Sequence, residues 1–365
     1  MKFSVNKKEL GDAVTNIQRA VSTKTSIPAL EGILIKSVDN AISLTAYDLE
    51  LGMQTIVNAS IAEHGKIVLS AKLFSDIVKK APSDSISFTI DEKNIATIES
   101  GNSNFTIIGI NPEEFPELPQ IGGTESLIIP GETIKSMIRQ TIFAVAENDS
   151  KPIHQGSLFV ADNGTLEVIS VDGYRLAIRR EKIDSATNTS FVVPGKTLSE
   201  VLKITGDEDV EIFPGRRYIM FQIGRYTIVS GILEGEFLDY QSAIPKQHTS
   251  EVSVKTREFI ESTERVSLLI SDRLKSPIRC SFEDNEIRIS CTTTMGRASD
   301  ELSAIISGNN VEMGFNNRYL LDALRNSECD EVKIMLTGSL NPMVIMPKEG
   351  DSFLFLVLPV RLKSE

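Results

Sequence analysis

The chain has 365 residues, which is enough for one to three domains with substantial hydrophobic cores. Its formal net charge of −12 argues against a simple basic nucleic-acid binder, although a basic surface can still form on an acidic protein. Its three cysteines are widely spaced, which indicates neither a disulfide framework nor a zinc site and favours a reducing compartment.

No apolar run approaches the length of a membrane-spanning helix, and the strongest run, 353–360, is strand-like. Residues 1–5 already alternate between polar and apolar, so no signal peptide is expected to precede the fold. The sequence therefore predicts a cytoplasmic protein that does not enter a membrane.

A short strand followed by an amphipathic helix opens each third of the chain. The strands begin at residues 3, 127 and 252, and apolar residues then recur at helical spacing. Between the helices, short alternating segments are separated by turn pairs that favour hairpins, at Asp39-Asn40, Asn163-Gly164 and Asp284-Asn285. This pattern predicts antiparallel sheets that helices cover on one side.

A second helix, with a basic face, is expected three times, over residues 71–79, 195–203 and 317–325. In the first copy Phe74 and Val78 lie on one apolar stripe because they are spaced i, i+4. Two basic residues, two turns apart, lie opposite each stripe. These pairs are Lys72 and Lys79, Lys196 and Lys203, and Arg318 and Arg325.

The basic pairs have two interpretations. Each can be an ordinary solvated helix face, in which Lys72 and Asp76 form an i, i+4 ion pair. Alternatively, the pairs make weak contacts to phosphates without reading the bases. The threefold repeat weakens the first interpretation without deciding between the two.

Two similar segments, 114–119 and 236–240, both begin with Glu-Phe and run into turn-rich sequence. We place domain boundaries just after them. The sequence therefore predicts three similar α+β domains, at 1–124, 125–248 and 249–365.

No catalytic residue, metal site or cofactor is predicted. Gly195-Lys196-Thr197 resembles the end of a phosphate-binding loop, but Ser190 stands where that loop needs a glycine. The three histidines are isolated and lack metal-ligand spacing, and no nucleophile elbow occurs. The chain is therefore not expected to be an enzyme.

Six further runs stand out along the chain, at 1–3, 44–50, 171–177, 236–240, 313–316 and 358–362. One of them, 171–177, predicts by itself only a hairpin turn at Asp172-Gly173. Together, the six runs make the whole chain similar to the bacterial sliding-clamp family, the β subunit of DNA polymerase III.

The resemblance implies the DNA-clamp fold, in which each domain has antiparallel sheets outside and two helices inside. It implies a head-to-tail homodimeric ring of six similar domains that encircles double-stranded DNA without sequence preference. By this resemblance, a clamp loader places the ring on DNA. The ring then tethers the replicative polymerase and other DNA polymerases through short apolar peptide motifs, and no catalysis is implied.

The resemblance also implies three sets of functional residues. As DNA contacts it adds Lys24, Asn148 and Lys151 to the six basic residues that the repeat indicates. The dimer contact comprises Phe105, Leu269 and Ile270. Arg175 and Arg361 are expected as polar rim contacts of a partner-peptide pocket. That pocket comprises His154, Val171, Gly173, Tyr174, Arg175, Leu176, Leu238, Ser242, Ala243, Leu356, Leu358, Pro359, Val360 and Arg361.

Three features depart from the family pattern. Ser242 stands where relatives often carry arginine on the pocket rim. Lys363-Ser364-Glu365 extends past the usual Arg-Leu ending and is expected to cover part of the pocket. Asn102 and Asn104 replace basic residues that some relatives use across the dimer contact.

Two alternatives of other classes stay open from the residues alone. One is a protein-only interaction scaffold whose basic rows are solvated faces. The other is an enzyme that uses the repeat as a scaffold for an unrecognised site. Retention on circular but not on linear DNA distinguishes a clamp from both.

Overall fold

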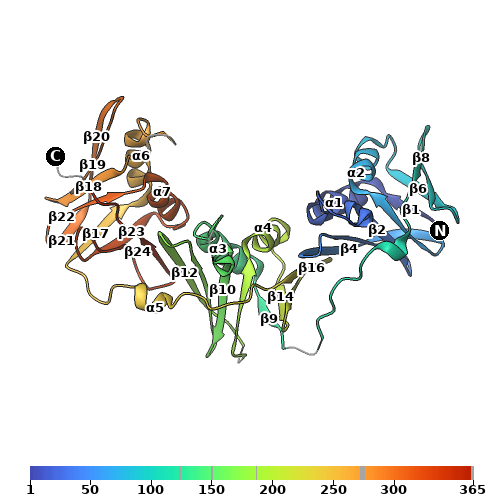
Figure 1. The fold of residues 1–365 in the computed structure, drawn as a ribbon, viewed down its shortest axis with the longest axis horizontal. Helices are drawn as coiled ribbons and strands as arrows, with labels where there is room; N and C mark the ends of the chain where they lie inside the picture. Colours follow the sequence, from blue (N-terminus) through green and yellow to red (C-terminus); the bar gives the residue numbers. More distant parts are fainter. Residues whose placement is uncertain (123–124, 149–150, 186, 272–275, 363–365) are drawn as a thin grey trace. The chain divides into compact units, whose positions relative to one another are not determined.

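The structure is a computed structural model that describes residues 1–122, 125–148, 151–185, 187–271 and 276–362. It divides into two compact units, whose elements are labelled in Figure 1. Unit 1 comprises Met1–Glu132 and Ser199–Ile232, and unit 2 comprises Thr133–Leu198 and Leu233–Glu365.

Unit 1 starts with the elements of the first third of the chain. Its helices are α1 (Lys7–Ile17) and α2 (Ala71–Lys80), with 3-10 turns at Gln18–Ala20, Pro28–Glu31 and Pro112–Glu114. The strands of this third are β1 (Lys2–Asn6), β2 (Gly32–Val38), β3 (Ala41–Tyr47), β4 (Leu51–Glu63), β5 (Lys66–Ser70), β6 (Ser85–Ile90), β7 (Ile95–Ser100) and β8 (Ser103–Ile108). The unit also contains β9 (Leu127–Ile129), most of α4 (Gly195–Ile204), β14 (Val210–Pro214), β15 (Tyr218–Ile223) and β16 (Tyr226–Gly231).

The strands of unit 1 form one antiparallel sheet. Its main path runs β8-β7-β6-β1-β4-β16-β15-β14-β9, and β3, β2 and β5 branch from β4. The pairing of β4 with β16 places Leu51 opposite Ser230 and carries the sheet from the first third of the chain into the second. Figure 1 shows α1 and α2 side by side next to these strands, and the two helices pack on each other.

Unit 2 contains the rest of the second third and the last third. Its helices are α3 (Gly131–Ile142), the short α5 (Tyr240–Ala243), α6 (Thr256–Ser267) and α7 (Asn317–Arg325), with a 3-10 turn at Pro152–Gln155. Its strands before α6 are β10 (Gly156–Asp162), β11 (Thr165–Val171), β12 (Arg175–Lys182), β13 (Thr189–Pro194) and β17 (Ser250–Lys255). Its later strands are β18 (Ile278–Glu283), β19 (Glu286–Thr293), β20 (Gly296–Ser303), β21 (Ile305–Gly308), β22 (Val311–Phe315), β23 (Glu331–Leu336), β24 (Met343–Pro347) and β25 (Phe353–Val357).

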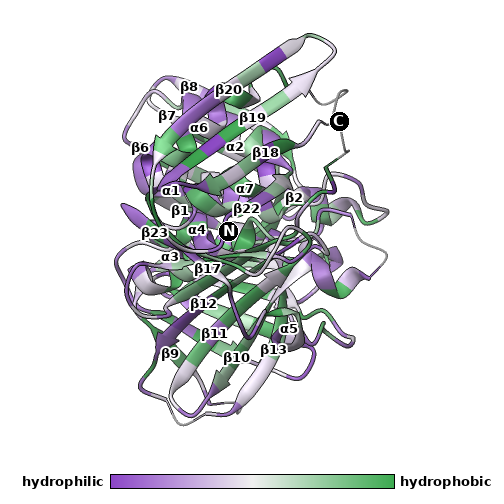
Figure 2. Cartoon of the chain, turned by 90° about the vertical axis from the view of Figure 1, so that its left-hand side faces the viewer, coloured by the Kyte–Doolittle hydropathy of each residue, from purple (hydrophilic) through white to green (hydrophobic). Residues whose placement is uncertain are grey.

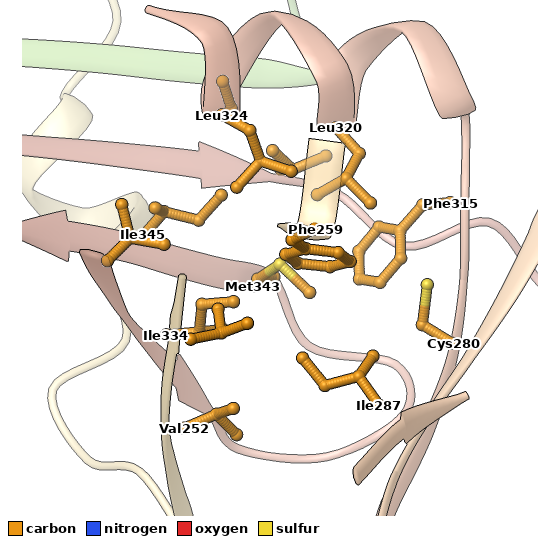
Figure 3. Close-up of a cluster of buried hydrophobic side chains, with 14 of the residues drawn as sticks. Val252, Phe259, Cys280, Ile287, Phe315, Leu320, Leu324, Ile334, Met343 and Ile345 are labelled. Atoms are coloured by element: carbon orange, nitrogen blue, oxygen red, sulfur yellow. The ribbon is translucent and has the colours of Figure 1, made fainter. Parts of the chain in front are cut away.

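These strands form two antiparallel sheets. A nine-stranded sheet runs β13-β10-β11-β12-β25-β24-β23-β17-β21, and a four-stranded sheet runs β20-β19-β18-β22. The pairing of β12 with β25 places Arg175 opposite Val357. It corresponds to the β4–β16 pairing of unit 1, which places Leu51 opposite Ser230. Figure 3 shows Phe259, Phe315 and Leu320 facing one another in the largest core cluster of this unit.

The three repeated helices are confirmed as α2, α4 and α7. Phe74 and Val78 of α2 are buried, as their spacing predicts. In α4 the stripe is narrower than expected, because Leu202 is only half-buried. The helix α7 begins after Asn316, whose Oδ1 accepts a hydrogen bond from the backbone N of Arg318 at 3.0 Å, so this asparagine caps the helix.

The three predicted hairpins are also confirmed, between β2 and β3, β10 and β11, and β18 and β19. Asp39, Asn163 and Asp284 have φ values of 46°, 48° and 51°. Asp and Asn tolerate this left-handed conformation better than other non-glycine residues, and two-residue hairpin turns require it. The turn residues therefore set the connections between these strands.

The hydropathy of the strands differs between the sheets. Figure 2 shows β10 and β11 as largely hydrophobic, whereas β20 carries several hydrophilic residues. Among the described residues, no helix has both the length and the apolar character needed to cross a bilayer.

Candidate nucleic-acid and peptide interfaces

The repeated helices α2, α4 and α7 each present two basic side chains to solvent. Because the opposite face of each helix packs into a core, the 3.6-residue period leaves these residues outside. The exposed basic residues are Lys72, Lys79, Lys196, Lys203, Arg318 and Arg325.

Of these six cations, Lys203 and Arg325 form ion pairs with carboxylates. Nζ of Lys203 lies 2.7 Å from Oε1 of Glu200, and Nη2 of Arg325 lies 2.5 Å from Oε1 of Glu264 on α6. Among the ion pairs of the described residues, none involves the two lysines of α2, so the i, i+4 pair considered for that helix is not formed. The row on α2 therefore keeps its charge for an external anion, whereas the rows on α4 and α7 are partly neutralised.

The other predicted DNA contacts lie in loops. Lys24 is exposed, and its carbonyl accepts a hydrogen bond from Oγ of Ser22 at 3.3 Å. Asn148 is exposed next to positions 149–150, which lie outside the described residues. Lys151 is exposed and directly precedes the 3-10 turn at Pro152–Gln155. Lys24 belongs to unit 1, and the other two belong to unit 2.

The hairpin between β11 and β12 is the centre of the predicted peptide pocket. Oδ1 of Asp172 accepts hydrogen bonds from the backbone N of Tyr174 at 2.9 Å and of Arg175 at 3.0 Å, which closes the turn. Gly173 has a φ of 85°, a conformation that glycine adopts without strain. The hairpin therefore holds one exposed glycine and one exposed tyrosine at its tip.

An apolar cluster lies behind this hairpin and joins segments that are distant in the sequence. Its buried members include the predicted pocket residues Val171, Leu176 and Leu356, and Leu358 packs against them. The structure therefore brings these four side chains together, as the resemblance implies. Sequence patterns alone could not do so, because β12 and β25 are more than 170 residues apart.

Arg175, which is expected as a polar rim contact, is held by two carboxylates and two aromatic rings. Its Nε is 2.9 Å from Oδ2 of Asp172, and its Nη1 is 2.5 Å from Oδ2 of Asp322 on α7. Its guanidinium also lies 4.6 Å from the ring centre of Tyr319 and 5.6 Å from that of Phe143, within cation–π range. Arg175 therefore ties β12 to α7, and its side chain is only 13% exposed.

A cavity of about 770 Å³ lies beside this arginine in unit 2. Val360 and Tyr174, two predicted pocket residues, line it, and Tyr174 stacks on Tyr319 with ring centres 5.8 Å apart. Asn148 and Ile270, which the resemblance assigns to DNA and dimer contacts, line the same cavity. The structure thus brings together residues from three predicted sets.

The segment 236–245 forms another wall of the apolar cluster. Phe237 packs against the cluster, and its ring meets that of buried His154 edge-on, with ring centres 5.6 Å apart. Tyr240 packs there as well, and its hydroxyl donates to Oε2 of Glu167 at 2.8 Å. Burial first, and then the bond to Glu167, raise the pKa of Tyr240 to about 12.

The remaining pocket residues lie at the surface. Leu238 and Val360 are each 40% exposed, so they are apolar groups within reach of solvent. The other exposed or half-exposed members are Ser242, Ala243, Pro359 and Arg361. Oγ of Ser242 donates to the carbonyl of Asp239 at 2.8 Å, and the 363–365 tail lies outside the described residues.

The predicted dimer residues lie near two sheet edges. Phe105 is half-buried on β8, the last strand of the sheet path in unit 1. Leu269 and Ile270 pack against the core of unit 2 rather than standing free. Sequence reasoning missed Ile108 and Leu268, which are each 83% exposed and are the apolar residues that such an edge contact could cover.

Comparisons with known proteins identify the family. Models for the N-terminal, central and C-terminal domains of the DNA polymerase III beta subunit match residues 1–119, 128–239 and 241–361. The beta sliding clamp of Bacillus subtilis (strain 168) is 32% identical over 376 residues, which covers 99% of this chain and 100% of that protein. This chain belongs to the DNA polymerase III beta subunit family.

Solved structures of beta subunits agree. A putative beta subunit from Eubacterium rectale matches with a TM-score of 0.95 at 34% identity, over 99% of both chains. The sliding clamp of Bacillus subtilis matches with a TM-score of 0.97 at 31% identity, over the whole of both chains. A sliding clamp from Pseudomonas aeruginosa, solved with griselimycin bound, matches at 0.94 and 26% identity over 99% of this chain and 100% of that one.

These relatives confirm the predicted family and the three-domain clamp fold. Beta subunits are processivity factors in DNA replication and do not catalyse a reaction. This chain accordingly has the role of a bacterial processivity factor, not of an enzyme.

Proposed function

We propose that two copies of this chain form a closed ring around double-stranded DNA, in the cytoplasm, and tether DNA polymerases to it. The observation that carries this proposal is a strand pairing that unit 1 and unit 2 repeat. In unit 1, β4 pairs with β16, and in unit 2, β12 pairs with β25. Each pair joins the sheets of consecutive thirds of the chain.

A third pair of the same kind needs a second copy. The next strand in the series β4, β12 is β20, and the strand of the first third that corresponds to β16 and β25 is β8. Both β8 and β20 end their sheet paths, so each has an edge that can accept a partner strand. Pairing β20 of one copy with β8 of another, twice, gives a head-to-tail ring of six domains.

Matching hairpin tips sets the register of that contact. The two-residue tip 49–50 before β4 corresponds to 294–295 before β20. The tip 224–225 before β16 corresponds to 101–102 before β8. In the ladder of unit 1, Thr227 pairs with Gln54. The same register places Asn104 opposite Ser299 of the second copy, with Phe105 one step further along.

Cross-linking tests this register. In a chain with Asn104→Cys and Ser299→Cys, oxidation should give a covalent dimer, because paired strands bring such Cα atoms within disulfide range. Asn104→Cys with Glu301→Cys shifts the register by two and keeps both residues on the same face, so it should cross-link poorly. Cross-linking of the shifted pair alone, or a monomer at micromolar concentration, would contradict the ring.

Retention on DNA tests the function itself. The ring should stay on nicked circular DNA and slide off when the circle is cut, because weak phosphate contacts alone do not hold it. A clamp loader is expected to open the ring for loading. Equal retention on circular and linear DNA would indicate ordinary binding instead of encirclement.

We also propose that short peptides of polymerases dock at the apolar cluster behind the β11–β12 hairpin. Leu358 and Phe237 pack against this cluster, and the residues that follow closely in sequence, Val360 and Leu238, are each 40% exposed. Leu238→Asp with Val360→Asp should abolish peptide binding without unfolding the chain, because both side chains already reach solvent. Leu340→Asp, at an exposed leucine elsewhere in unit 2, is the matched control. Unchanged affinity in the double variant would remove the pocket assignment.

We keep the proposed domain boundaries, 1–124, 125–248 and 249–365. Three consecutive family-model matches support a division into three domains, although the C-terminal match begins at residue 241 rather than 249. Each proposed domain then carries one helix with a basic row. The hole of the ring would be lined by those rows, together with Lys24, Asn148 and Lys151.

A further inference from the structure

The hairpin at the proposed peptide pocket has a structural copy in unit 1. In the hairpin between β3 and β4, Oδ1 of Asp48 accepts hydrogen bonds from the backbone N of Glu50 at 3.0 Å and of Leu51 at 2.7 Å. These bonds repeat those that Asp172 makes in the hairpin between β11 and β12. Leu49, with a φ of 77°, occupies the place of Gly173, so the backbone is the same even where the residue type disfavours it.

The neighbouring strand is also repeated. In unit 1 the backbone N of Gly231 donates a hydrogen bond to the carbonyl of Glu50 at 3.1 Å. In unit 2 the backbone N of Leu358 donates the corresponding bond to the carbonyl of Tyr174 at 2.9 Å. Positions 231 and 358 are therefore equivalent. In the closing strand pairs, Tyr47 lies opposite Gly52 and Val171 lies opposite Leu176, so positions 52 and 176 are equivalent as well.

The two copies differ at these equivalent positions. The pocket in unit 2 has leucines at 176 and 358, whereas the copy in unit 1 has Gly52 and Gly231. A Cβ at position 52 would lie only 2.4 Å from Cδ2 of Leu118, which therefore occupies the space above this glycine. A Cβ at position 231 would meet nothing within 4 Å.

The sheet face around the hairpin is also more polar in unit 1 than in unit 2. In unit 1, Nε2 of Gln54 donates to Oγ1 of Thr45 at 3.0 Å, and both line a cavity of about 680 Å³ with further polar residues. At the equivalent places in unit 2, Ile169 and Ile178 belong to the buried apolar cluster. An apolar peptide anchor therefore finds an apolar surface in unit 2 and a mixed polar and apolar one in unit 1.

We propose that unit 1 carries a closed copy of the peptide pocket, with Leu118 of the chain itself as its occupant. Positions 52, 118 and 231 then restrict each chain to one bound peptide. This inference rests on the proposed peptide pocket of unit 2. It adds that unit 1 contains a second hairpin with the same backbone conformation. The side chains around that hairpin make it unsuitable for binding the same peptide.

The packing part of the proposal has a test that does not involve peptide. Gly52→Leu should lower Tm by about 5 °C, because the new side chain collides with Leu118. Leu118→Ala should also lower Tm, because it leaves a void. The two changes together should restore most of the loss, since the leucine is then supplied by β4, as β12 supplies it in unit 2. Additive losses in the double variant would overturn the assignment of Leu118 as occupant.

The binding part is tested by the number of sites. Calorimetric titration with a short synthetic peptide that carries leucine and phenylalanine anchors should give one site per wild-type chain. Gly52→Leu/Leu118→Ala/Gly231→Leu rebuilds both leucines and should give two sites. The matched control has Gly231→Ser in place of Gly231→Leu and should give one site.

A combined variant separates this inference from the pocket on which it rests. When Leu238→Asp/Val360→Asp is added to the rebuilt chain, one site should remain, now in unit 1. Two sites in the wild type, or one site in the rebuilt chain with a cooperative Tm, would overturn the inference while the pocket of unit 2 stands. No site in the wild type would remove the pocket and this inference together.

Discussion

At the scale of single residues, Arg175 decides how β12 is held to α7. It bridges Asp172 and Asp322, and its side chain is largely buried. Arg175→Met should lower the free energy of unfolding by about 3 kcal/mol, the low end for a broken buried pair, because Asp322 is partly exposed and tolerates the loss better. Urea unfolding measures this change. Adding Asp172→Asn and Asp322→Asn should recover much of the lost stability. No recovery would show that the packing of Arg175 against aromatic side chains, rather than its charge, makes the larger contribution.

Tyr240 gives a prediction for pH. Its pKa is raised to about 12 in the folded chain, above the usual value of 10.0. The raised value means that the folded chain holds this proton more tightly, so the associated stability is full below pH 10 and is lost as pH rises towards 12. The chain has no tryptophan, so tyrosine ionisation is easily followed by absorbance.

The matched variant is Tyr240→Phe, which keeps the ring and removes the hydroxyl. It should lower stability at neutral pH by about 1 kcal/mol, the usual loss for one hydrogen bond. It should also remove the late-ionising step from the absorbance titration. If that step persists in the variant, it belongs to another tyrosine and the bond to Glu167 is weaker than its geometry indicates.

At the scale of elements, the basic rows are expected to contribute unequally to DNA binding. Lys72→Glu/Lys79→Glu on α2 should weaken binding more than Lys203→Glu/Arg325→Glu, because the second pair already has carboxylate partners. Both variants reverse two charges, so each is a control for the other. The slope of log K against log salt should fall by up to about 2 for the α2 variant, and by less for the other.

Reversal of all six row residues should abolish loading on DNA and leave the fold intact, while single reversals should have small effects. Normal loading by the sixfold variant would show that the rows are only solvated faces. Loading assays on circular DNA, with circular dichroism as the check on folding, measure both.

The helices and hairpins could be predicted from the sequence because their signals are local. Phe74, Ile77 and Val78 repeat at helical spacing, and Asp39-Asn40 favours a two-residue turn. The pairing of β12 with β25 could not be predicted from such patterns, since strand neighbours are set by contacts between distant segments. For the same reason the ion pair between Arg175 and Asp322, which lie 147 residues apart, could not be predicted.

The pocket set came from resemblance, and the structure shows which of its members share one cluster. Leu268 and Ile108 could have been found only by knowing that they are exposed, because their apolar character alone is typical of a core. Likewise, sequence patterns assign no role to Gly52. Only the structure shows that Leu118 fills the space that a side chain at position 52 would need.

At the scale of the whole molecule, the size of a duplex argues for two chains in the ring. Helices pack about 8–10 Å apart and are about 10 Å thick, so six in a circle leave a hole of roughly 7 Å. Twelve leave roughly 24 Å by the same estimate, enough for a duplex on the order of 20 Å across. Light scattering should therefore give about twice the chain mass of 40.2 kDa. A value of one chain mass for a preparation that encircles DNA would contradict the proposal.

The β4–β16 ladder has a consequence for how the chain unfolds. Because this ladder joins two thirds of the chain in one sheet, unit 1 contains β14, β15 and β16 together with the whole first third. Amide hydrogens of these three strands should therefore exchange with solvent at the same rate as those of β1 and β6, and not at the rate of β10 or β11. A cooperative opening event would thus cross the boundary that duplication of the sequence suggests. A destabilising change in β14, β15 or β16 would then be felt first by the N-terminal third of the chain.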